Sequence, residues 1–204
     1  YFGKLISEAR QEKRICFLLF FKHAKTFTAW DIGYNDCTAI WVFQIVGKEI
    51  HLVDHYENSG EDLAHYVKWL RDKPYMYDSH YLPHDAQAKS GATGKSYADF
   101  ARQMGLKVSV LKRADNELSG IEILRATLPR MFFEEKKTSV GLKAVEAFRK
   151  EWNDKLGCYR DKSHHDWASH SSKALIYCAE ACATASGGQG LTPEQWRKLR
   201  DEYI

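Results

Sequence analysis

Between residues 27 and 56 the chain has the pattern of three strands joined by short turns, and this feature constrains its fold most strongly. Residues 27–32, 38–46 and 49–56 are rich in β-branched and aromatic side chains. Residues 33–36 and the pair at 47–48 supply the turns. Because turns this short join neighbouring antiparallel strands, the sequence predicts a three-stranded antiparallel meander.

Helix-like and strand-like segments alternate after the meander. Apolar residues spaced i, i+3, i+4 and i+7 from Leu63 predict a helix, with Ser59 as its expected start. Ser96 and Asp99 open another helix in capping-box spacing. The other expected elements are strands at 76–84 and 107–111, helices at 118–128, 139–150 and 165–185, and a hairpin or loop at 153–163. This order predicts an α/β fold, in which a mixed sheet carries the meander and has helices on both faces.

The length of 204 residues lies within the range of one domain. Residues 1–25 carry six Lys or Arg against two Glu, and we interpret them as a basic lead-in or linker that docks partly through residues 16–21. Residues 26–186 form the predicted folded domain. Residues 187–204 are expected to hold a glycine-rich break and a C-terminal helix.

Composition excludes several classes of protein. Hydrophobic residues make up 44% of the chain and charged residues 28%, values that exclude collagen-like and disordered chains. The five cysteines form no CxxC pair, so we expect reduced thiols and no cysteine-based zinc site. The longest apolar run, residues 15–21, is far shorter than the roughly twenty residues that span a bilayer, and we expect no membrane partner. The net charge of +3 leaves nucleic-acid binding open.

Two aspartates lie where predicted strands end. Asp31 ends the first strand within an apolar segment, where a carboxylate is costly unless it is paired or binds a cation. Asp85 lies at the carboxyl end of the fourth strand, where α/β sheets place ligands. The alternative for both is an ordinary role in a turn.

A third aspartate, Asp166, shares one stripe of the predicted last helix with His170, Lys173 and Tyr177. The alternative is a solvated helix face. Three carboxylates that converge at the strand ends would suit two Mg²⁺ or Mn²⁺ ions and the hydrolysis of a phosphodiester.

The loop after Asp85 carries Lys89 and Lys95, which are candidates for contacts with DNA phosphates or plain solvent-exposed residues. Residues 91–96 end like a phosphate-binding loop. That motif needs Gly at position 89, where this chain has Lys89, so we do not expect ATP binding there.

Three motifs together resemble a known family. They are TAWDIG at 28–33, followed by Asp36; LPHDA at 82–86; and HDWASH at 165–170, followed by Tyr177. They are similar to motifs in the nuclease domain of tailed-bacteriophage terminase large subunits, and the similarity runs from about residue 30 to residue 182. It implies an RNase H-like fold and a two-metal endonuclease that cuts concatemeric double-stranded viral DNA during genome packaging.

The same resemblance implies further partners and a location. It implies an ATPase domain upstream of residues 1–25, a terminase small subunit, a portal protein and the host cell cytoplasm. Two other interpretations of the sequence are a non-catalytic DNA-binding or docking module of a packaging motor and another RNase H-like nuclease, such as a junction resolvase or an integrase core.

Carried over residue by residue, the resemblance makes Asp31 and Asp85 metal ligands and catalytic residues, and matches Asp166 to a late acidic ligand. Many relatives carry H-x-x-D-A-x-R-Y, which this chain matches with HSSKALIY at 170–177. Lys173 therefore stands where an Asp is common, and its ammonium is a third candidate for a contact with a DNA phosphate. The resemblance leaves the third metal ligand as Asp166, His170 or both.

Overall fold

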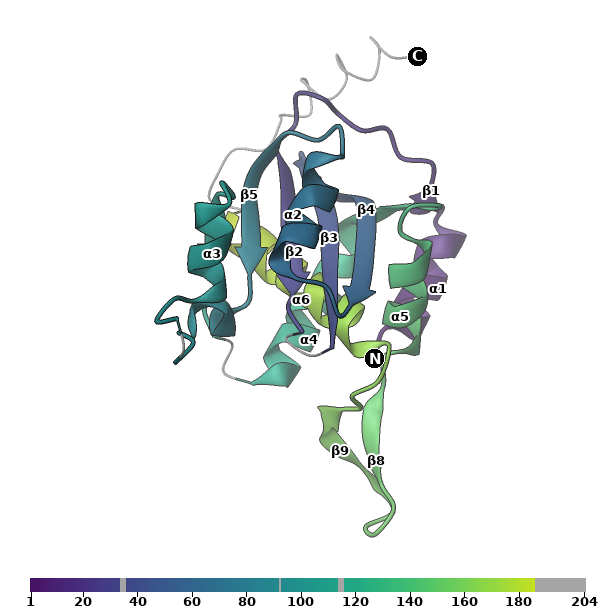
Figure 1. The fold of residues 1–204 in the computed structure, drawn as a ribbon. Coiled ribbons are helices and arrows are strands. Elements are labelled where there is room, and N and C mark those ends of the chain that lie inside the picture. Colours follow the sequence, from purple (N-terminus) through teal and green to yellow (C-terminus); the bar gives the residue numbers. More distant parts are fainter. Residues whose placement is uncertain (34–35, 92, 114–115, 186–204) are drawn as a thin grey trace.

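A mixed sheet of seven strands lies at the centre of the computed structural model, which describes residues 1–33, 36–91, 93–113 and 116–185 (Figure 1). The strands are β1 (Ile15–Cys16), β2 (Thr26–Asp31), β3 (Cys37–Val46), β4 (Glu49–Ser59), β5 (Tyr77–Leu82), β6 (Val108–Val110) and β7 (Met131–Glu134). They lie in the order β1-β7-β4-β3-β2-β5-β6. Strands β2, β3 and β4 form the predicted antiparallel meander, and every other pairing in the sheet is parallel.

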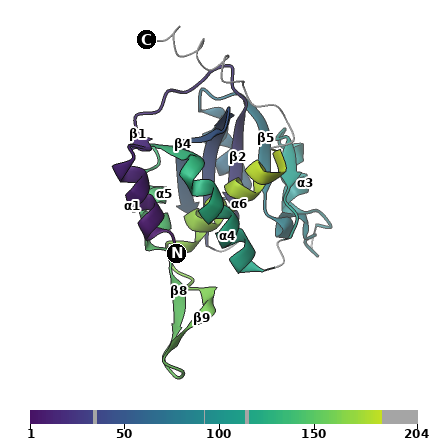
Figure 2. The ribbon, with the colours of Figure 1, turned by 180° about the vertical axis from the view of Figure 1, so that it is seen from behind.

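Helices cover both faces of the sheet, as predicted (Figures 1 and 2). The helices are α1 (Gly3–Gln11), α2 (Leu63–Arg71), α3 (Tyr97–Gln103), α4 (Glu117–Thr127), α5 (Ser139–Ala147) and α6 (Ser169–Ala185), with 3-10 turns η1 (His84–Gln87) and η2 (Leu128–Arg130). Helices α2 and α3 pack on one face, and α1, α4, α5 and α6 on the other. A two-stranded hairpin, β8 (Lys150–Asn153) and β9 (Cys158–Ser163), projects from the body of the molecule (Figure 1).

Strands β2 and β3 are buried along almost their whole length because helices cover them from both sides. Ala29, Trp41 and Phe43 point into the core that α1, α4, α5 and α6 complete. Trp30 and Ile40 point into the core under α2 and α3. Helix α6 packs directly across β2 and β3, so its first turn reaches the edge at which β2 ends.

Helix α1 packs into the domain core, which differs from the linker that we expected for residues 1–25. Phe2, Ile6 and Ala9 are fully buried on one face of α1. The guanidinium of Arg14 donates hydrogen bonds to the carbonyls of Leu128 and Met131. The charged residues Lys4, Glu8 and Arg10 lie on the outer side of α1, whose apolar side packs against α5 and η2.

Some element ends differ from the expected ones. Helix α2 begins after Asp62, whose carboxylate accepts a hydrogen bond from the His65 amide, so Ser59 is not its cap. The capping box of Ser96 and Asp99 is confirmed. Strand β7 was not expected, and the polar stretch near residue 153 forms a hairpin. The expected C-terminal helix at 187–204 lies outside the described residues. No helix in the described ranges has the length and apolar character needed to cross a membrane.

Gly141→Ala tests how closely α5 approaches the sheet. A Cβ at Gly141 would lie 2.5 Å from Cζ2 of Trp41 and 2.7 Å from Cδ2 of His55. Because both rings are buried, we expect the substitution to lower the free energy of unfolding by about 1–3 kcal/mol. Gly3→Ala is the matched control, since its Cβ would lie 3.6 Å from the carbonyl oxygen of Glu146. Chemical denaturation compares the two variants, and equal stability would contradict this packing.

Candidate functional site

Asp31 lies at the carboxyl end of β2, where α6 begins to cross the sheet. Its Oδ2 accepts a hydrogen bond from Nδ1 of His170 at 2.8 Å. The two side chains are only 12% and 10% exposed. The Asp31 carboxylate is the largest cause that raises the pKa of His170, and it outweighs the opposing effect of burial. The carboxylate that was expected to be costly is therefore paired with an imidazole from the last helix.

Asp85 lies in η1, just past the end of β5. Strand β5 runs parallel to β2, with Tyr81 paired to Ala29, so the chain leaves both strands at the same edge of the sheet. Burial is the main cause that raises the pKa of the Tyr177 hydroxyl, and the charges of Asp31 and Asp85 raise it further. The charges of both carboxylates thus affect the pKa of one side chain of α6. The structure brings Asp31 and Asp85 to a common edge.

Asp36 is a further acidic group at this edge, just before β3. Its Oδ2 lies 2.9 Å from Nε2 of His170 and 3.2 Å from Nε2 of His165. The hydrogen bond from His170 is the largest cause that lowers the pKa of Asp36. Sequence reasoning assigned no role in the site to Asp36 or His165, because no spacing rule links residues this far apart in the chain.

Glu57 is a second acidic group that sequence reasoning missed. Asp31 pairs with Ala39 across β2 and β3, and Ala39 pairs with Glu57 across β3 and β4, so all three side chains point to the α6 face. The hydroxyl of Ser171 donates a hydrogen bond to Oε2 of Glu57 at 2.5 Å. Burial lowers the pKa of His55 to about 3, so its ring is neutral and donates Nε2–H to the same hydroxyl at 2.7 Å. Glu57 lies near the end of a largely buried strand, and this position was the one signal in the sequence that could have indicated a role in the site.

The thiol of Cys37 lies among these acidic groups. Its pKa is raised to about 11, chiefly by burial and next by the charge of Glu57. Asp36 and Asp31 add smaller effects in the same direction. This edge of the sheet therefore carries a concentrated negative charge that a cation could offset.

Asp166 occupies a different environment from the other predicted carboxylates. Its Oδ2 lies 2.9 Å from a guanidinium nitrogen of Arg149, and its Oδ1 accepts a hydrogen bond from the Ala168 amide. Its backbone amide donates to the hydroxyl of Ser169 at the start of α6. None of these contacts, all within the described ranges, joins it to Asp31 or Asp85. Its role as a metal ligand stays a prediction.

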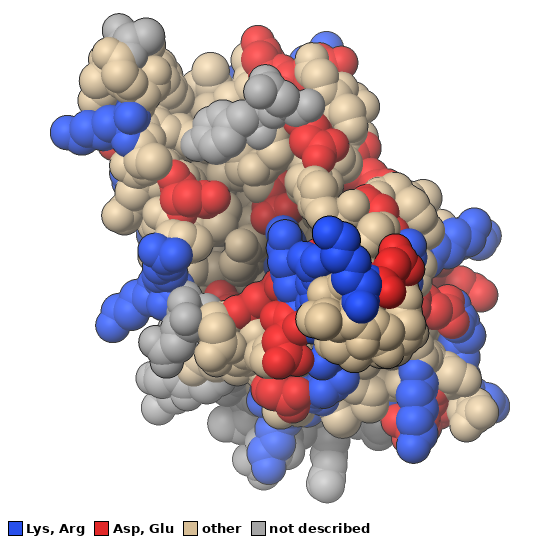
Figure 3. Space-filling model, turned by 90° about the horizontal axis from the view of Figure 1, so that it is seen from below, with Lys and Arg blue, Asp and Glu red and all other residues tan. Residues whose placement is uncertain are grey.

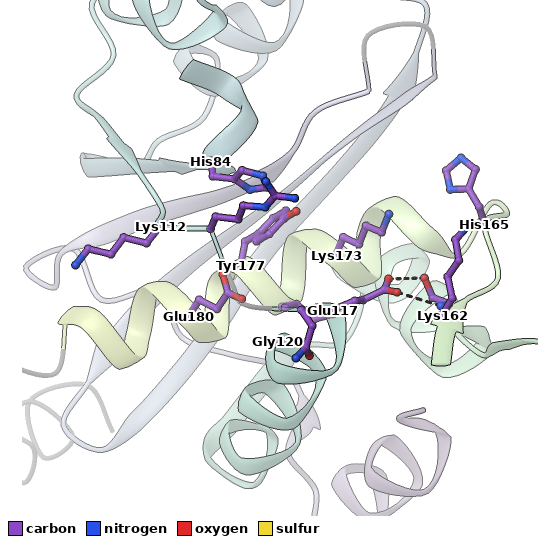
Figure 4. A pocket seen from close by; sticks show the side chains of 13 residues that line it. His84, Lys112, Glu117, Gly120, Lys162, His165, Lys173, Tyr177 and Glu180 are labelled. Atoms are coloured by element: carbon purple, nitrogen blue, oxygen red, sulfur yellow. Dashed lines mark hydrogen bonds between the residues drawn. The ribbon is translucent and has the colours of Figure 1, made fainter. Parts of the chain in front are cut away.

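A cleft of about 560 Å³ opens beside α6 (Figure 4). Lys173, Tyr177 and Glu180 reach into it from α6, and His84, the neighbour of Asp85 in the chain, lies on its other side. Four cationic side chains line it: Lys112, Arg113, Lys162 and Lys173. On the lower face of the molecule, lysines and arginines lie among acidic side chains around a hollow (Figure 3).

The two predicted lysines of the loop after Asp85 do not line this cleft. Lys89 is exposed and its backbone forms an isolated bridge with Ser96. The ammonium of Lys95 lies 3.3 Å from Oε1 of Gln103. Only Lys173 among the three predicted phosphate contacts is a cleft residue.

Several solved structures with a similar fold are large terminases or their nuclease domains. The large terminase of a thermophilic bacteriophage matches with a TM-score of 0.65 and 14% sequence identity, over 88% of this chain and 45% of that one. The nuclease domain of the P22 large terminase matches with a TM-score of 0.65 and 15% identity, over 84% of this chain and 89% of that one. The nuclease domain of the SPP1 large terminase with bound Mn matches with a TM-score of 0.56 and 14% identity, over 77% and 86%.

No protein-family model matches the sequence, and no curated protein matches it. The chain spans about 45% of the length of the large terminase from the thermophilic bacteriophage. The predicted resemblance to terminase nuclease domains is confirmed at the level of structure. The chain has the RNase H-like fold of those domains, as the sequence predicted.

The pair of His170 and Asp31 predicts a pH-dependent contribution to stability. Because the pKa of His170 in the folded chain lies above its ordinary value of 6.5, this stabilisation is complete below pH 6.5 and is lost as the pH rises through the raised pKa. An NMR titration should find this raised pKa, and Asp31→Asn should lower it. His55 is the internal control, since its ring should stay neutral throughout. If the pKa of His170 is the same in the Asp31→Asn variant as in the unchanged chain, the pairing of the two side chains is contradicted.

Proposed function

We propose that the chain is the nuclease domain of a phage large terminase and hydrolyses phosphodiester bonds of concatemeric double-stranded DNA during genome packaging. One observation carries the proposal. Asp31 and Asp85 leave adjacent parallel strands at one edge of a sheet that has the terminase nuclease fold. Ligands of α/β proteins bind outside the carboxyl ends of such strands.

The two carboxylates fit a hard divalent cation. The hydrogen bond from His170 engages Oδ2 of Asp31, and Oδ1 accepts no hydrogen bond from a side chain of the described ranges. Carboxylate oxygens are the ligands that Mg²⁺ and Mn²⁺ prefer, and the SPP1 domain holds Mn. We propose that Asp31 and Asp85 hold two such ions together with His170, Asp166 or both. Bound ions would activate a water and stabilise the leaving oxygen.

The cleft beside α6 supports DNA as the substrate. Lys112, Arg113, Lys162 and Lys173 place four positive charges along its wall. Such side chains bind phosphates without reading the base sequence. We keep Lys89 and Lys95 as further phosphate contacts outside the cleft.

The assembly around this domain is also a proposal. Since the chain matches less than half of the large terminase from the thermophilic bacteriophage, we propose that an ATPase domain precedes residues 1–25 in the full polypeptide. A terminase small subunit and a portal protein would be its partners in the cytoplasm of the host cell.

Asp31→Asn and Asp85→Asn test the proposed centre. Each amide keeps the shape of the carboxylate but loses its charge, so we expect plasmid cleavage with Mn²⁺ to fall at least about 100-fold. Asp72→Asn is the matched control, because Asp72 is an exposed aspartate at the end of α2. Circular dichroism verifies folding, and EDTA should abolish the activity of the unchanged chain.

Full cleavage by a folded Asp31→Asn variant would refute the metal role of Asp31. A chain that binds DNA but never cleaves it would support the second candidate, a non-catalytic docking module. Lys173 favours that alternative, because its cationic side chain lines the cleft where an acid is common in relatives.

Lys173→Asp tests whether the ammonium of Lys173 opposes the binding of a metal ion at the proposed centre. If the ammonium opposes the loading of a metal ion, the substitution should tighten Mn²⁺ binding by about tenfold and raise the rate of cleavage. Lys162→Asp is the matched control, since it reverses the same charge on another wall of the cleft. Isothermal calorimetry compares the two variants with the unchanged chain. Equal or weaker Mn²⁺ binding by Lys173→Asp would show that Lys173 does not oppose the ion.

A further inference from the structure

The hairpin of β8 and β9 projects from the body of the molecule and exposes apolar side chains (Figure 1). Trp152, Leu156 and Tyr159 are 48%, 74% and 63% exposed. The rings of Trp152 and Tyr159 meet edge to face at 4.8 Å, and residues 154–162 are all exposed. Scattered exposed apolar residues are ordinary, but three on one projecting hairpin indicate a binding surface.

The tip of this hairpin is an ordered turn. Oδ1 of Asn153 accepts hydrogen bonds from the amides of Lys155 and Leu156 at 3.1 Å and 3.3 Å. Gly157 completes the turn with a φ of 61°, a conformation that glycine adopts without strain. The turn therefore presents Leu156 to solvent in a fixed position, which lowers the entropic cost of a contact made there.

The base of the hairpin is fastened to the body at two points. The carboxylate of Glu117, in the first turn of α4, accepts hydrogen bonds from both the amide and the hydroxyl of Ser163 (Figure 4). A guanidinium nitrogen of Arg149 lies 2.9 Å from Oδ2 of Asp166. These contacts fix the direction of the hairpin relative to α4 and α6, the two helices that border the cleft.

Positive charge continues from the cleft onto the hairpin. Residues 149–162 carry five Lys or Arg against three Asp or Glu. Lys162, on β9, lines the cleft, and the exposed Lys155 lies next to Leu156 at the tip. Because the cleft is the proposed path of the DNA, the hairpin extends the same cationic surface outwards.

The dimensions of the hairpin favour the major groove. Neighbouring strands stand about 4.8 Å apart before side chains are added. The major groove is about 12 Å wide and admits a two-stranded ribbon, whereas the minor groove is only about 6 Å wide. At about 3.3 Å per residue, β8 alone spans roughly 10 Å. This length exceeds the depth of the major groove, which is about 8.5 Å.

We propose that the hairpin of β8 and β9 inserts into the major groove of the duplex whose phosphates lie in the cleft. Leu156 contacts base edges there, and Lys155 contacts a phosphate beside the groove. This inference rests on the proposed action on double-stranded DNA. A leucine side chain forms no hydrogen bond with a base, so binding by the hairpin stays nearly independent of base sequence.

Leu156→Asp tests the contact at the tip. A fluorescent duplex in EDTA is bound without being cut, and its anisotropy gives the Kd. We expect the Kd of Leu156→Asp to rise at least about tenfold, because the change removes an apolar contact and sets a carboxylate among phosphates. Met76→Asp is the matched control, since Met76 is 83% exposed and immediately precedes β5.

Lys155→Ala and two groove-binding dyes test how the hairpin lies on DNA. Lys155→Ala should lower the slope of log Kd against log salt by about one, whereas Lys68→Ala, an exposed lysine of α2, should leave it unchanged. Methyl green, which occupies the major groove, should weaken binding of the unchanged chain more than that of Leu156→Asp. Distamycin, which occupies the minor groove, should affect both chains equally.

Three outcomes would overturn the inference: a normal Kd for Leu156→Asp, an equal loss in Met76→Asp, or competition by distamycin alone. Self-association of the chain that Leu156→Asp abolishes, with DNA binding unchanged, would also overturn it and would indicate a protein partner. Cleavage with Mn²⁺ is a separate readout. If the unchanged chain cleaves DNA but the hairpin variants bind normally, only the hairpin inference fails; if they lose binding but the chain never cleaves, only the nuclease fails.

Discussion

The hydrogen bond between Asp31 and His170 joins the end of the first meander strand to the first turn of the last helix. Both partners are largely buried, so removal of one would leave the other polar group without compensation. With His170 fixed, the helical repeat places Lys173 and Tyr177 on the cleft side of α6. The neighbouring Ser171 then reaches Glu57 on the opposite side of the same edge. The register of α6 thus sets the positions of most of the polar groups in the candidate site.

The sheet and most helices could be predicted because their signals are local. Strands β2, β3 and β4 combine apolar, β-branched sequence with short turns, and Ser96 with Asp99 is a self-contained helix start. Helix α1 could not be recognised from the sequence because charged residues dominate the composition of this segment. Its buried residues are Phe2, Ile6 and Ala9, and they form an apolar face that is evident only when α1 packs against α5 and η2. Strand β7 has four residues and owes its conformation to pairing with β1 and β4.

Some residues of the candidate site could likewise be predicted from the sequence, whereas others could not. Asp31 and Asp85 could be found because strand ends are visible in a sequence and parallel strands share an edge. Asp36 and Glu57 were missed because the contacts that define them come from α6, more than 100 residues away in the chain. Asp166 has the spacing of a site residue, yet Arg149 and the Ala168 amide engage its two oxygens. The helix was expected to begin at residue 165 but begins at Ser169, so Asp166 precedes α6 and helical spacing does not place it.

The location of a bound ion would test the central claim most directly. A crystal of this chain soaked in Mn²⁺ and measured at a wavelength where manganese scatters anomalously would show each ion as a separate peak. The account predicts a peak in contact with carboxylate oxygens of both Asp31 and Asp85. Manganese bound elsewhere, with no peak between these two residues, would contradict the assignment of this edge of the sheet as a metal-dependent nuclease centre.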